Sequence, residues 1–454
     1  MKGACSSSLL TDLYQLTMLQ AYWQHRMDGV AVFELFVRKL PPERAFLVAA
    51  GLEQALDFIE QARFDEAELD WVANCGTFAP GFVDWLRELR FTGDVWAMPE
   101  GTVFFPNEPI VRVVAPIAEA QWLETRILNL IHFQTVIASK AARAVLAANG
   151  HALIDFGLRR AHGAEAGALA ARAAYLAGFA GTATAYAGPR FGIPVFGTMA
   201  HSFVQAHDDE SQAFTRFAES FPANAMLLID TYDTVEGARC VAGIAPRLAE
   251  RGIRIKGVRL DSGDLDALSR EVRGVLDDAG LRDAVIFASG NLDERRVHAL
   301  VAAGAPITSF GVGTSLTTSS DAPYLDAVYK LQEYAGQARR KRSAGKATWP
   351  GCKQVFRALD ADGRLARDTV ALAHETFPGE PLLAEVMHDG RRIAPSPPLA
   401  LARTHCAAQL AALPPRLRTL DGPWPAFPVT LSPAIRTLAD DVDQRQANHA
   451  ALAH

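Results

Sequence analysis

The sequence predicts an α/β protein built around an irregular, TIM-like barrel of parallel strands. Apolar runs of strand length recur after residue 151 and alternate with helical patterns such as 234–250 and 265–279. Strands that are apolar along their whole length, separated by helices, indicate a parallel sheet with helices outside it. About six or seven such units suit a barrel. The runs are ALIDF (152–156), TATA (182–185), IPVFG (193–197), AMLLID (225–230), IKGVRL (255–260), AVIFAS (284–289) and ITSFGV (307–312).

The regions on both sides of the alternation predict additional structure. A chain of 454 residues is too long for one compact core. Helical patterns at 11–22, 51–62 and 119–146 surround a strand pattern at 30–37, and Pro-punctuated β-rich runs occupy 94–114. We therefore divide the chain into an N-terminal α+β part (1–135), a barrel with the active-site loops (136–325), a C-terminal part (326–425) and a polar tail (426–454).

Composition excludes several classes of function. The formal net charge of -6 does not favour nucleic-acid binding, although a local basic pocket for a small anion remains compatible with it. No long apolar stretch is free of charge and the N-terminus lacks a signal-peptide pattern, so we expect no membrane partner and a cytoplasmic location. Five cysteines, Cys5 among them, form no CxxC pair, which favours free thiols over a zinc site.

Polar residues follow almost every expected strand. In a barrel these strand-to-helix loops open onto one face, where catalysis takes place. The competing interpretation is that loops are polar in any protein. The residues concerned are Arg159, Arg160 and His162, then Thr198 and His201, then Asp230, Asp233, Asp261 and Asp264, and finally Gly290, Asn291, Gly313 and Thr314.

Two of these loops carry a more specific signal. The GVGTS loop (311–315) lets backbone N–H groups approach a phosphate, although it matches no P-loop and a tight turn with a helix cap is equally compatible. In VRLDSGDL (258–265), Asp261 and Asp264 suit sugar hydroxyls or Mg²⁺, and Arg259 offers a planar fork for a carboxylate or phosphate. The alternative for this second loop is a helix N-cap with a surface ion pair.

Two single residues are ambiguous by themselves. His201 follows an expected barrel strand, but a lone histidine is as often structural as functional at such a place. Phe156 could stack on a flat ring, although its pattern favours a core position.

Several motifs in a fixed order resemble the nicotinate phosphoribosyltransferases, a type II phosphoribosyltransferase family. The match covers roughly residues 9–415. Together the motifs are far more specific than any one of them. They are LLTDLYQLTML (9–19), FELFVRKLP (33–41), DFGLRRAHG (155–163), FGTMAHSFV (196–204), LLIDTYDT (227–234), VRLDSGDL (258–265), ASGNLDE (288–294), SFGVGTSLTTS (309–319) and YKL (329–331).

The resemblance implies a ligase-type reaction coupled to ATP. Nicotinate and phosphoribosyl pyrophosphate give nicotinate mononucleotide and pyrophosphate, within NAD salvage. Mg²⁺ is expected as cofactor, held mainly through pyrophosphate, with Asp264 as a candidate ligand. A homodimer with shared active sites is expected, because Tyr14 and Arg38 lie far in sequence from the barrel loops. The similar fold adds a second α+β domain built from both ends of the chain.

The resemblance also implies a role for individual residues. His201 matches the histidine that ATP phosphorylates, and Asp261 matches a catalytic position beside the sugar. Tyr14, from the partner subunit, and Phe156 match the two faces of the pyridine ring. Thr198, Arg159 and Arg259 match positions near nicotinate. The phosphoribosyl part is matched by Gly290, Gly311, Gly313 and Thr314, and a phosphate by Arg38 with Lys39.

Alternative functions differ in particular residues. The similar nicotinamide-using enzymes carry an Asp after a Gly-Thr, where this chain has Ala183, so the acid is favoured over the amide. A quinolinate enzyme should need more basic residues. A non-catalytic phosphoribosyl-binding homologue should have lost His201 or Asp261, and both are present. An aldolase-like barrel would rest on Lys256 alone.

Overall fold

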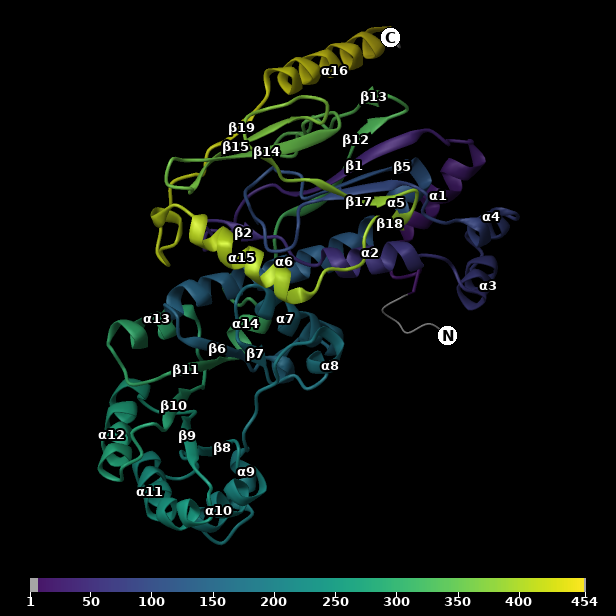
Figure 1. Cartoon of the computed structure of the whole chain (residues 1–454). Coiled ribbons are helices and arrows are strands. Elements are labelled where there is room, and N and C mark those ends of the chain that lie inside the picture. The colour runs from purple at the N-terminus through teal and green to yellow at the C-terminus, as the bar shows by residue number, and fades with distance from the viewer. Residues whose placement is uncertain (1–6, 453–454) are drawn as a thin grey trace. The chain divides into compact units, whose positions relative to one another are not determined.

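The computed structural model describes residues 7–452 and divides into two compact units (Figure 1). One unit, called here the terminal unit, combines Met1–Ser139 with Tyr324–His454. The other, the central unit, is Lys140–Pro323. Because both ends of the chain contribute to the terminal unit, the central unit is an insertion within it.

The central unit contains a curled parallel sheet. Its order is β7 (Gly181–Thr182), β6 (Ala152–Asp155), β11 (Ser309–Val312), β10 (Val285–Ala288), β9 (Ile255–Leu260) and β8 (Ala225–Leu228). Every neighbouring pair in this order is parallel. Within the described residues no pairing joins β7 to β8, so the barrel is an open half-barrel. The predicted irregular α/β barrel is thereby confirmed.

Strand and helix formation in this unit follow from local sequence. Apolar side chains such as Val258, Leu260 and Ile286 are fully buried, as a sheet covered on both faces requires. The helices α11 (Thr234–Glu250), α12 (Leu265–Asp278) and α13 (Glu294–Ala302) each begin after an aspartate whose side chain accepts backbone N–H groups. The other helices are η2 (Leu158–Arg160), α7 (Ala164–Leu176), α8 (Ala187–Phe191), α9 (His201–Gln205), α10 (Glu210–Ser220) and α14 (Thr314–Thr317).

One expected strand, IPVFG at 193–197, does not form. Its only sheet contact among the described residues is an isolated bridge from Val195 to Thr182. Pro194 has no N–H for a ladder, and although Ile193 is buried, Val195 and Phe196 are exposed, so the segment is not covered as a barrel strand would be. The segment expected at 182–185 is also shorter than expected, since β7 ends at Thr182.

The terminal unit is a layered α+β structure that joins the two ends of the chain. Its seven-stranded sheet has the order β13-β12-β1-β5-β3-β17-β18. In it, β1 (Val30–Val37) pairs antiparallel with β12 (Ala327–Tyr334), and Phe33 stacks on Tyr329 at 4.9 Å between ring centroids. This confirms the expected second domain made from N- and C-terminal parts.

The remaining elements complete the terminal unit (Figure 1). A four-stranded sheet has the order β16-β14-β15-β19, and β2 pairs with β4. The strands are β2 (Leu47–Val48), β3 (Asp94–Ala97), β4 (Val103–Phe104), β5 (Val111–Pro116), β13 (Gln337–Ala338), β14 (Lys353–Leu359), β15 (Leu365–Leu372), β16 (Glu380–Pro381), β17 (Ala384–His388), β18 (Arg391–Arg392) and β19 (Val429–Leu431). The helices are α1 (Leu13–Gln24), α2 (Leu52–Gln61), α3 (Glu66–Asn74), α4 (Phe82–Glu88), α5 (Ile117–Trp122), α6 (Glu124–Ala148), α15 (Leu399–Ala412), η3 (Pro415–Leu417) and α16 (Pro433–Leu452).

Two further sequence expectations concern the whole chain. Among the helices of residues 7–452, none combines the length and the apolar character needed to cross a membrane. Cys75, Cys240, Cys352 and Cys406 are free thiols. Cys5 lies outside the described residues.

Candidate active site

Arg259 is the hub of a side-chain cluster at the carboxyl ends of the central strands. It is the fifth residue of β9, and its side chain is 14% exposed. Its Nε donates to Ser289 Oγ at 3.0 Å, and its Nη1 donates to Thr198 Oγ1 at 3.2 Å and to the Met199 carbonyl at 3.4 Å. Its Nη2 donates to Asp261 Oδ1 at 3.0 Å. The ends of β9 and β10 and the segment that leads into α9 thus converge on one cation.

Asp261 is held as an acceptor beside this cation. Its Oδ1 accepts hydrogen bonds from Arg259 and from the Ser289 hydroxyl. Burial would raise the pKa of Asp261, but the Ser289 hydrogen bond, the Arg259 guanidinium and the charge of His201 together lower that pKa. The carboxylate is therefore ionised at neutral pH and offers a fixed negative charge near the strand ends.

His201 lies between two carboxylates and a hydroxyl. It is the first residue of α9, its side chain is 40% exposed, and its Nδ1 lies 3.1 Å from Thr231 Oγ1. Its Nε2 is 4.0 Å from Asp230 Oδ1 and 3.8 Å from Asp261 Oδ2. One imidazole nitrogen is thus engaged by a hydroxyl, and the other faces the acidic side of the cluster.

Asp230 is the most buried acid of the cluster. Its side chain is 1% exposed, and its Oδ2 accepts from the Asp261 backbone N–H at 3.0 Å and from Ser262 Oγ at 2.6 Å. Its Oδ1 has no hydrogen-bond partner among the residues that the structure describes. Because a buried carboxylate oxygen without a partner is costly, this atom is a natural point of attachment for a cation or donor.

Phe156 covers the other side of the guanidinium. The Arg259 Cζ lies 5.4 Å from the centroid of its ring. A Cβ added at Gly311 would come within 2.9 Å of the Phe156 ring, and one at Gly313 within 3.0 Å of the Phe156 carbonyl. The absence of a side chain at these two glycines therefore leaves the space that Phe156 occupies. The predicted core position of Phe156 is only partly realised, since its side chain is half-buried.

A buried acid fixes the loops beside Phe156. Asp155 is 1% exposed, accepts from Thr182 Oγ1 at 2.7 Å and accepts from the Gly157 N–H at 2.8 Å. Burial raises the pKa of Asp155, and these two hydrogen bonds oppose the rise. The ends of β6 and β7 are thus tied together, and Ala183 follows at once in an exposed position.

The structure joins most of the expected barrel residues into one cluster. Direct contacts link five of them, namely Thr198, His201, Arg259, Asp261 and Phe156. Gly290, Gly311 and Gly313 pack closely against Asp261 and Phe156. A Cβ at Gly290 would approach the Asp261 carbonyl oxygen to 1.8 Å, at a φ of +96°.

Other expected residues lie outside these contacts. Arg159 is exposed in η2, and no contact within residues 7–452 ties it to Arg259. Thr314 begins α14. Asp264 serves as N-cap of α12, with Oδ1 accepting from the backbone of Asp266 and Ala267. The helix-cap interpretation of that loop is therefore realised at Asp264, while Arg259 and Asp261 belong to the cluster.

Tyr14 and Arg38 belong to the terminal unit. Tyr14 is 47% exposed on α1 and lines a hollow of about 330 Å³ together with Glu124 and His132. Arg38 pairs with Asp326 at 3.2 Å and lines another hollow, of about 360 Å³, together with Arg340. Both residues thus border open space within their own unit.

Sequence reasoning named the loops but missed part of the cluster. Asp230 was noted only as a polar residue after a strand, and Thr231 and Ser289 were not singled out. The signal was present for Asp230, which ends an apolar run, but nothing in a single sequence shows that the hydroxyls of Thr231 and Ser289 face His201 and Arg259.

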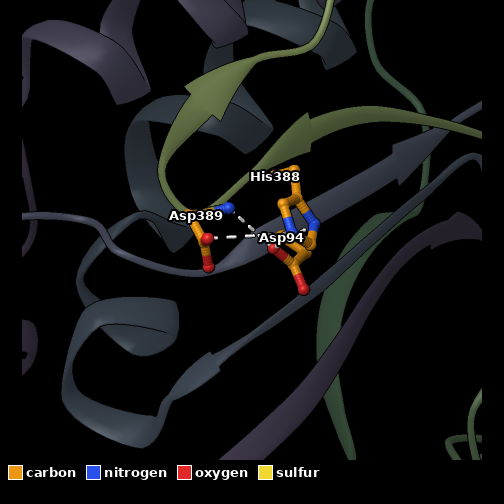
Figure 2. Close-up of side chains that lie close together, drawn as sticks. All are labelled: Asp94, His388 and Asp389. Atoms are coloured by element: carbon orange, nitrogen blue, oxygen red, sulfur yellow. Dashed lines mark hydrogen bonds and ion pairs between the residues drawn. The ribbon is translucent and has the colours of Figure 1, made fainter.

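A second group of metal-ligand types lies in the terminal unit. Figure 2 shows Asp94, His388 and Asp389 close together on β3 and the β17–β18 hairpin. His388 Nδ1 lies 3.3 Å from Asp94 Oδ1 and 2.9 Å from Glu385 Oε1. The hydrogen bond to Glu385 and the charges of Asp389 and Asp94 raise the pKa of His388. The His388 side chain is 61% exposed and is already paired with these carboxylates, so we interpret this cluster as a surface ion-pair network.

Comparisons with known proteins give a consistent result. Family models match residues 9–132 (nicotinate phosphoribosyltransferase N-terminal domain), 151–346 (nicotinate phosphoribosyltransferase family) and 375–439 (nicotinate phosphoribosyltransferase C-terminal domain). The chain is 53% identical over 429 residues to nicotinate phosphoribosyltransferase pncB2 of Mycobacterium tuberculosis, covering 94% of this chain and 92% of the relative. It is 42% identical to nicotinate phosphoribosyltransferase of Bacillus subtilis, covering 82% and 77%.

A solved structure agrees with these relatives. The crystal structure of human nicotinic acid phosphoribosyltransferase is 31% identical to this chain and superposes with a TM-score of 0.85. That similarity covers 95% of this chain and 99% of the human chain. Fold and sequence therefore point in the same direction over nearly the whole chain.

Proposed function

The chain belongs to the nicotinate phosphoribosyltransferase family, from which we infer that it transfers a phosphoribosyl group to nicotinate in NAD biosynthesis. The substrates are nicotinate and phosphoribosyl pyrophosphate, and the products are nicotinate mononucleotide and pyrophosphate. The alternative of a nicotinamide enzyme is not favoured by the relatives. The observation that carries the local chemistry is the convergence of Arg259, Asp261 and His201 at the strand ends.

We propose the following division of labour in the transfer step. The lone pair of the pyridine nitrogen forms the bond to C1 of the ribose, while the C1–O bond breaks and its electron pair leaves with pyrophosphate. Positive charge develops on the sugar ring, which the ionised Asp261 carboxylate stabilises. The nucleophile is already unprotonated and needs no general base. Orientation of the ring is therefore the main task of the nicotinate pocket.

Arg259 and Thr198 are proposed to bind the nicotinate carboxylate. The Nη1 of Arg259 and the hydroxyl of Thr198 already lie 3.2 Å apart, so one carboxylate can accept from both. Phe156 lies over the same guanidinium and offers a flat apolar face to the pyridine ring. Arg159, Gly290, Gly311, Gly313 and Thr314 remain proposed substrate-binding residues on the same loops.

ATP coupling is proposed to act through His201. Its half-exposed imidazole carries one nitrogen beside the Thr231 hydroxyl, which favours a single orientation of the ring. Transfer of the ATP γ-phosphoryl group would form a phosphorus–nitrogen bond and release ADP, and later hydrolysis of that bond would return free His201. The two nearby carboxylates, Asp230 and Asp261, suit a site that must also release a charged product.

Magnesium is proposed as the cation that accompanies pyrophosphate. The fit rests on Asp230, whose buried Oδ1 lacks a partner among the described residues, and on the neighbouring Asp261 carboxylate. Asp264 is a weaker candidate because its Oδ1 caps α12. When bound, Mg²⁺ would supply positive charge to the leaving pyrophosphate.

A homodimer in the cytoplasm completes the proposal. Support for shared active sites is the exposure of Tyr14 and the hollow beside Arg38, both of which leave these residues accessible to a second subunit. Support for the cytoplasm is the cysteine pattern of the sequence, which suits a reducing compartment.

One assay tests these statements together. Purified protein is given phosphoribosyl pyrophosphate and Mg²⁺ with nicotinate, nicotinamide or quinolinate, each with and without ATP, and mononucleotide is measured. We expect nicotinate to be preferred and ATP to stimulate its use. The variant His201→Ala should lose ATP stimulation but retain basal turnover. The control is His207→Ala, which should retain both, because His207 Nδ1 lies 2.7 Å from the Phe203 carbonyl oxygen and takes no part in the cluster. Equal stimulation of both variants would refute the phosphohistidine role.

A further inference from the structure

We propose that the Ser289 hydroxyl is a positioning group that locks Arg259 and Asp261 into one arrangement for the transfer reaction. The proposal rests on the function proposed above, because it assigns Ser289 a task within that site. In this proposal Ser289 contacts no reactant and acts through Arg259 and Asp261.

A backbone hydrogen bond fixes the position of Ser289 independently of its side chain. It directly follows β10, and its N–H donates to the Leu260 carbonyl at 2.8 Å, which extends the pairing of β10 with β9. Its side chain is almost fully buried, with 2% of the residue exposed. The Oγ atom is therefore held at the point where the Arg259 and Asp261 side chains meet.

The hydroxyl satisfies two partners of opposite charge at once. Its Oγ accepts from Arg259 Nε at 3.0 Å and donates its one proton to Asp261 Oδ1. Arg259 Nη2 donates to the same Oδ1 at 3.0 Å, which closes a ring of three hydrogen bonds. Because a hydroxyl donates and accepts together, a side chain without one leaves both charged neighbours short of a partner.

This ring determines which atoms remain for the reactants. With Nε and Nη2 held by Ser289 and Asp261, Nη1 is directed toward Thr198 Oγ1 and the Met199 carbonyl, contacts that a nicotinate carboxylate would share or replace. With Oδ1 engaged, Asp261 presents Oδ2 on the side of His201, at 3.8 Å from Nε2. Without Ser289, Arg259 and Asp261 would be free to rotate into a direct bidentate pair, which would withdraw the guanidinium from a nicotinate carboxylate.

The substitution Ser289→Ala should therefore affect nicotinate before it affects the fold. We expect the KM for nicotinate to rise roughly tenfold, and more than the KM for phosphoribosyl pyrophosphate, in line with a lost hydrogen bond to a charged group.

The test compares three variants of the full chain in the mononucleotide assay. Ser289→Ala removes the hydroxyl, Ser289→Thr retains it, and Ser269→Ala removes another buried hydroxyl that bonds only within α12, to the Asp266 carbonyl. The proposal expects Ser289→Ala to raise the KM for nicotinate more than the KM for phosphoribosyl pyrophosphate. It expects near-normal values in Ser289→Thr and unchanged values in Ser269→Ala.

Three outcomes would overturn it. Ser289→Ala could match the wild type in both KM values, Ser289→Thr could be as impaired as Ser289→Ala, or Ser269→Ala could reproduce the same changes, which would make the effect one of packing. A wild-type protein that makes no mononucleotide from nicotinate would overturn the proposed function, and this inference with it. If the wild type is active and any of the three outcomes is observed, only the positioning role of Ser289 is refuted.

Discussion

Arg259 Nη2 and Asp261 Oδ1 lie 3.0 Å apart, joined by a hydrogen bond between two residues separated by only one position at the end of β9. A strand repeats every two residues, so both side chains emerge on the same side. One carries the charge that a carboxylate substrate requires, and the other the charge that a developing sugar cation requires. The alternation of a single strand thus brings the two binding functions together.

Replacing Arg259 by lysine should weaken nicotinate binding selectively. Lysine keeps the charge but loses the planar fork that reaches Thr198, Ser289 and Asp261 together. We expect the KM for nicotinate to rise about ten- to a hundredfold, with a smaller change for phosphoribosyl pyrophosphate. Steady-state kinetics with each substrate varied would measure both, and Arg270→Lys on the exposed surface of α12 is the control. Equal changes for the two substrates would count against the assignment.

Replacing Thr231 by valine should impair ATP coupling without removing the transfer chemistry. The hydroxyl that lies 3.1 Å from His201 Nδ1 is lost, while shape and volume are nearly kept. We expect ATP stimulation to fall severalfold and turnover without ATP to remain. The comparison variant is Thr308→Val, whose hydroxyl donates to the Ile286 carbonyl at 3.0 Å, away from His201. Undiminished stimulation in Thr231→Val would show that this hydroxyl has no part in orienting the imidazole.

Gly290 should tolerate no side chain. It has a φ of +96°, and a Cβ there would lie 1.8 Å from the Asp261 carbonyl oxygen. We expect Gly290→Ala to lower the free energy of unfolding by about 2–4 kcal/mol and to abolish most activity, because the loop carrying Asp261 must move. Gly280→Ala separates the causes, since Gly280 has a φ of +76° but open space around it, and should cost about 1 kcal/mol. If urea unfolding showed that Gly290→Ala and Gly280→Ala lower the free energy of unfolding by similar amounts, the steric argument would be refuted.

Glu108 should make the stability of the terminal unit depend on pH. Burial and the neighbouring Asp368 carboxylate raise the pKa of Glu108 well above its usual range. The folded protein therefore keeps a proton that the unfolded chain releases above about pH 4.3, so this group's contribution is complete below that pH and declines as the pH rises toward the folded pKa.

The variant Glu108→Gln removes this dependence because an amide does not titrate. The difference between its free energy of unfolding and that of the wild type should therefore increase in favour of the variant as the pH rises from 5 to 8. Glu88→Gln, at an exposed position on α4, is the control and should follow the wild type. Parallel curves for the wild type and Glu108→Gln would show that Glu108 is ionised in the folded protein.

The amino-acid sequence is sufficient to predict the class of fold and the loops that hold the candidate site residues. Continuous apolar runs predicted β6, β8, β9, β10 and β11, because a strand covered on both faces needs apolar residues throughout. The polar residues at the end of the run at 255–260 pointed to Arg259 and Asp261, because the ends of parallel strands share one edge. His201 was expected after the run at 193–197, which forms no strand. The resemblance of the ordered motifs to one family is supported by the relatives.

Tertiary structure alone decided the partners of those residues. Apolar letters do not distinguish a buried strand from the exposed segment at Val195, where Pro194 interrupts pairing. A single sequence likewise does not show that Ser289 and Thr231 turn their hydroxyls toward Arg259 and His201, since 30 residues separate the members of each pair. Such contacts depend on the register of neighbouring strands and the course of their loops, which packing of the whole unit determines.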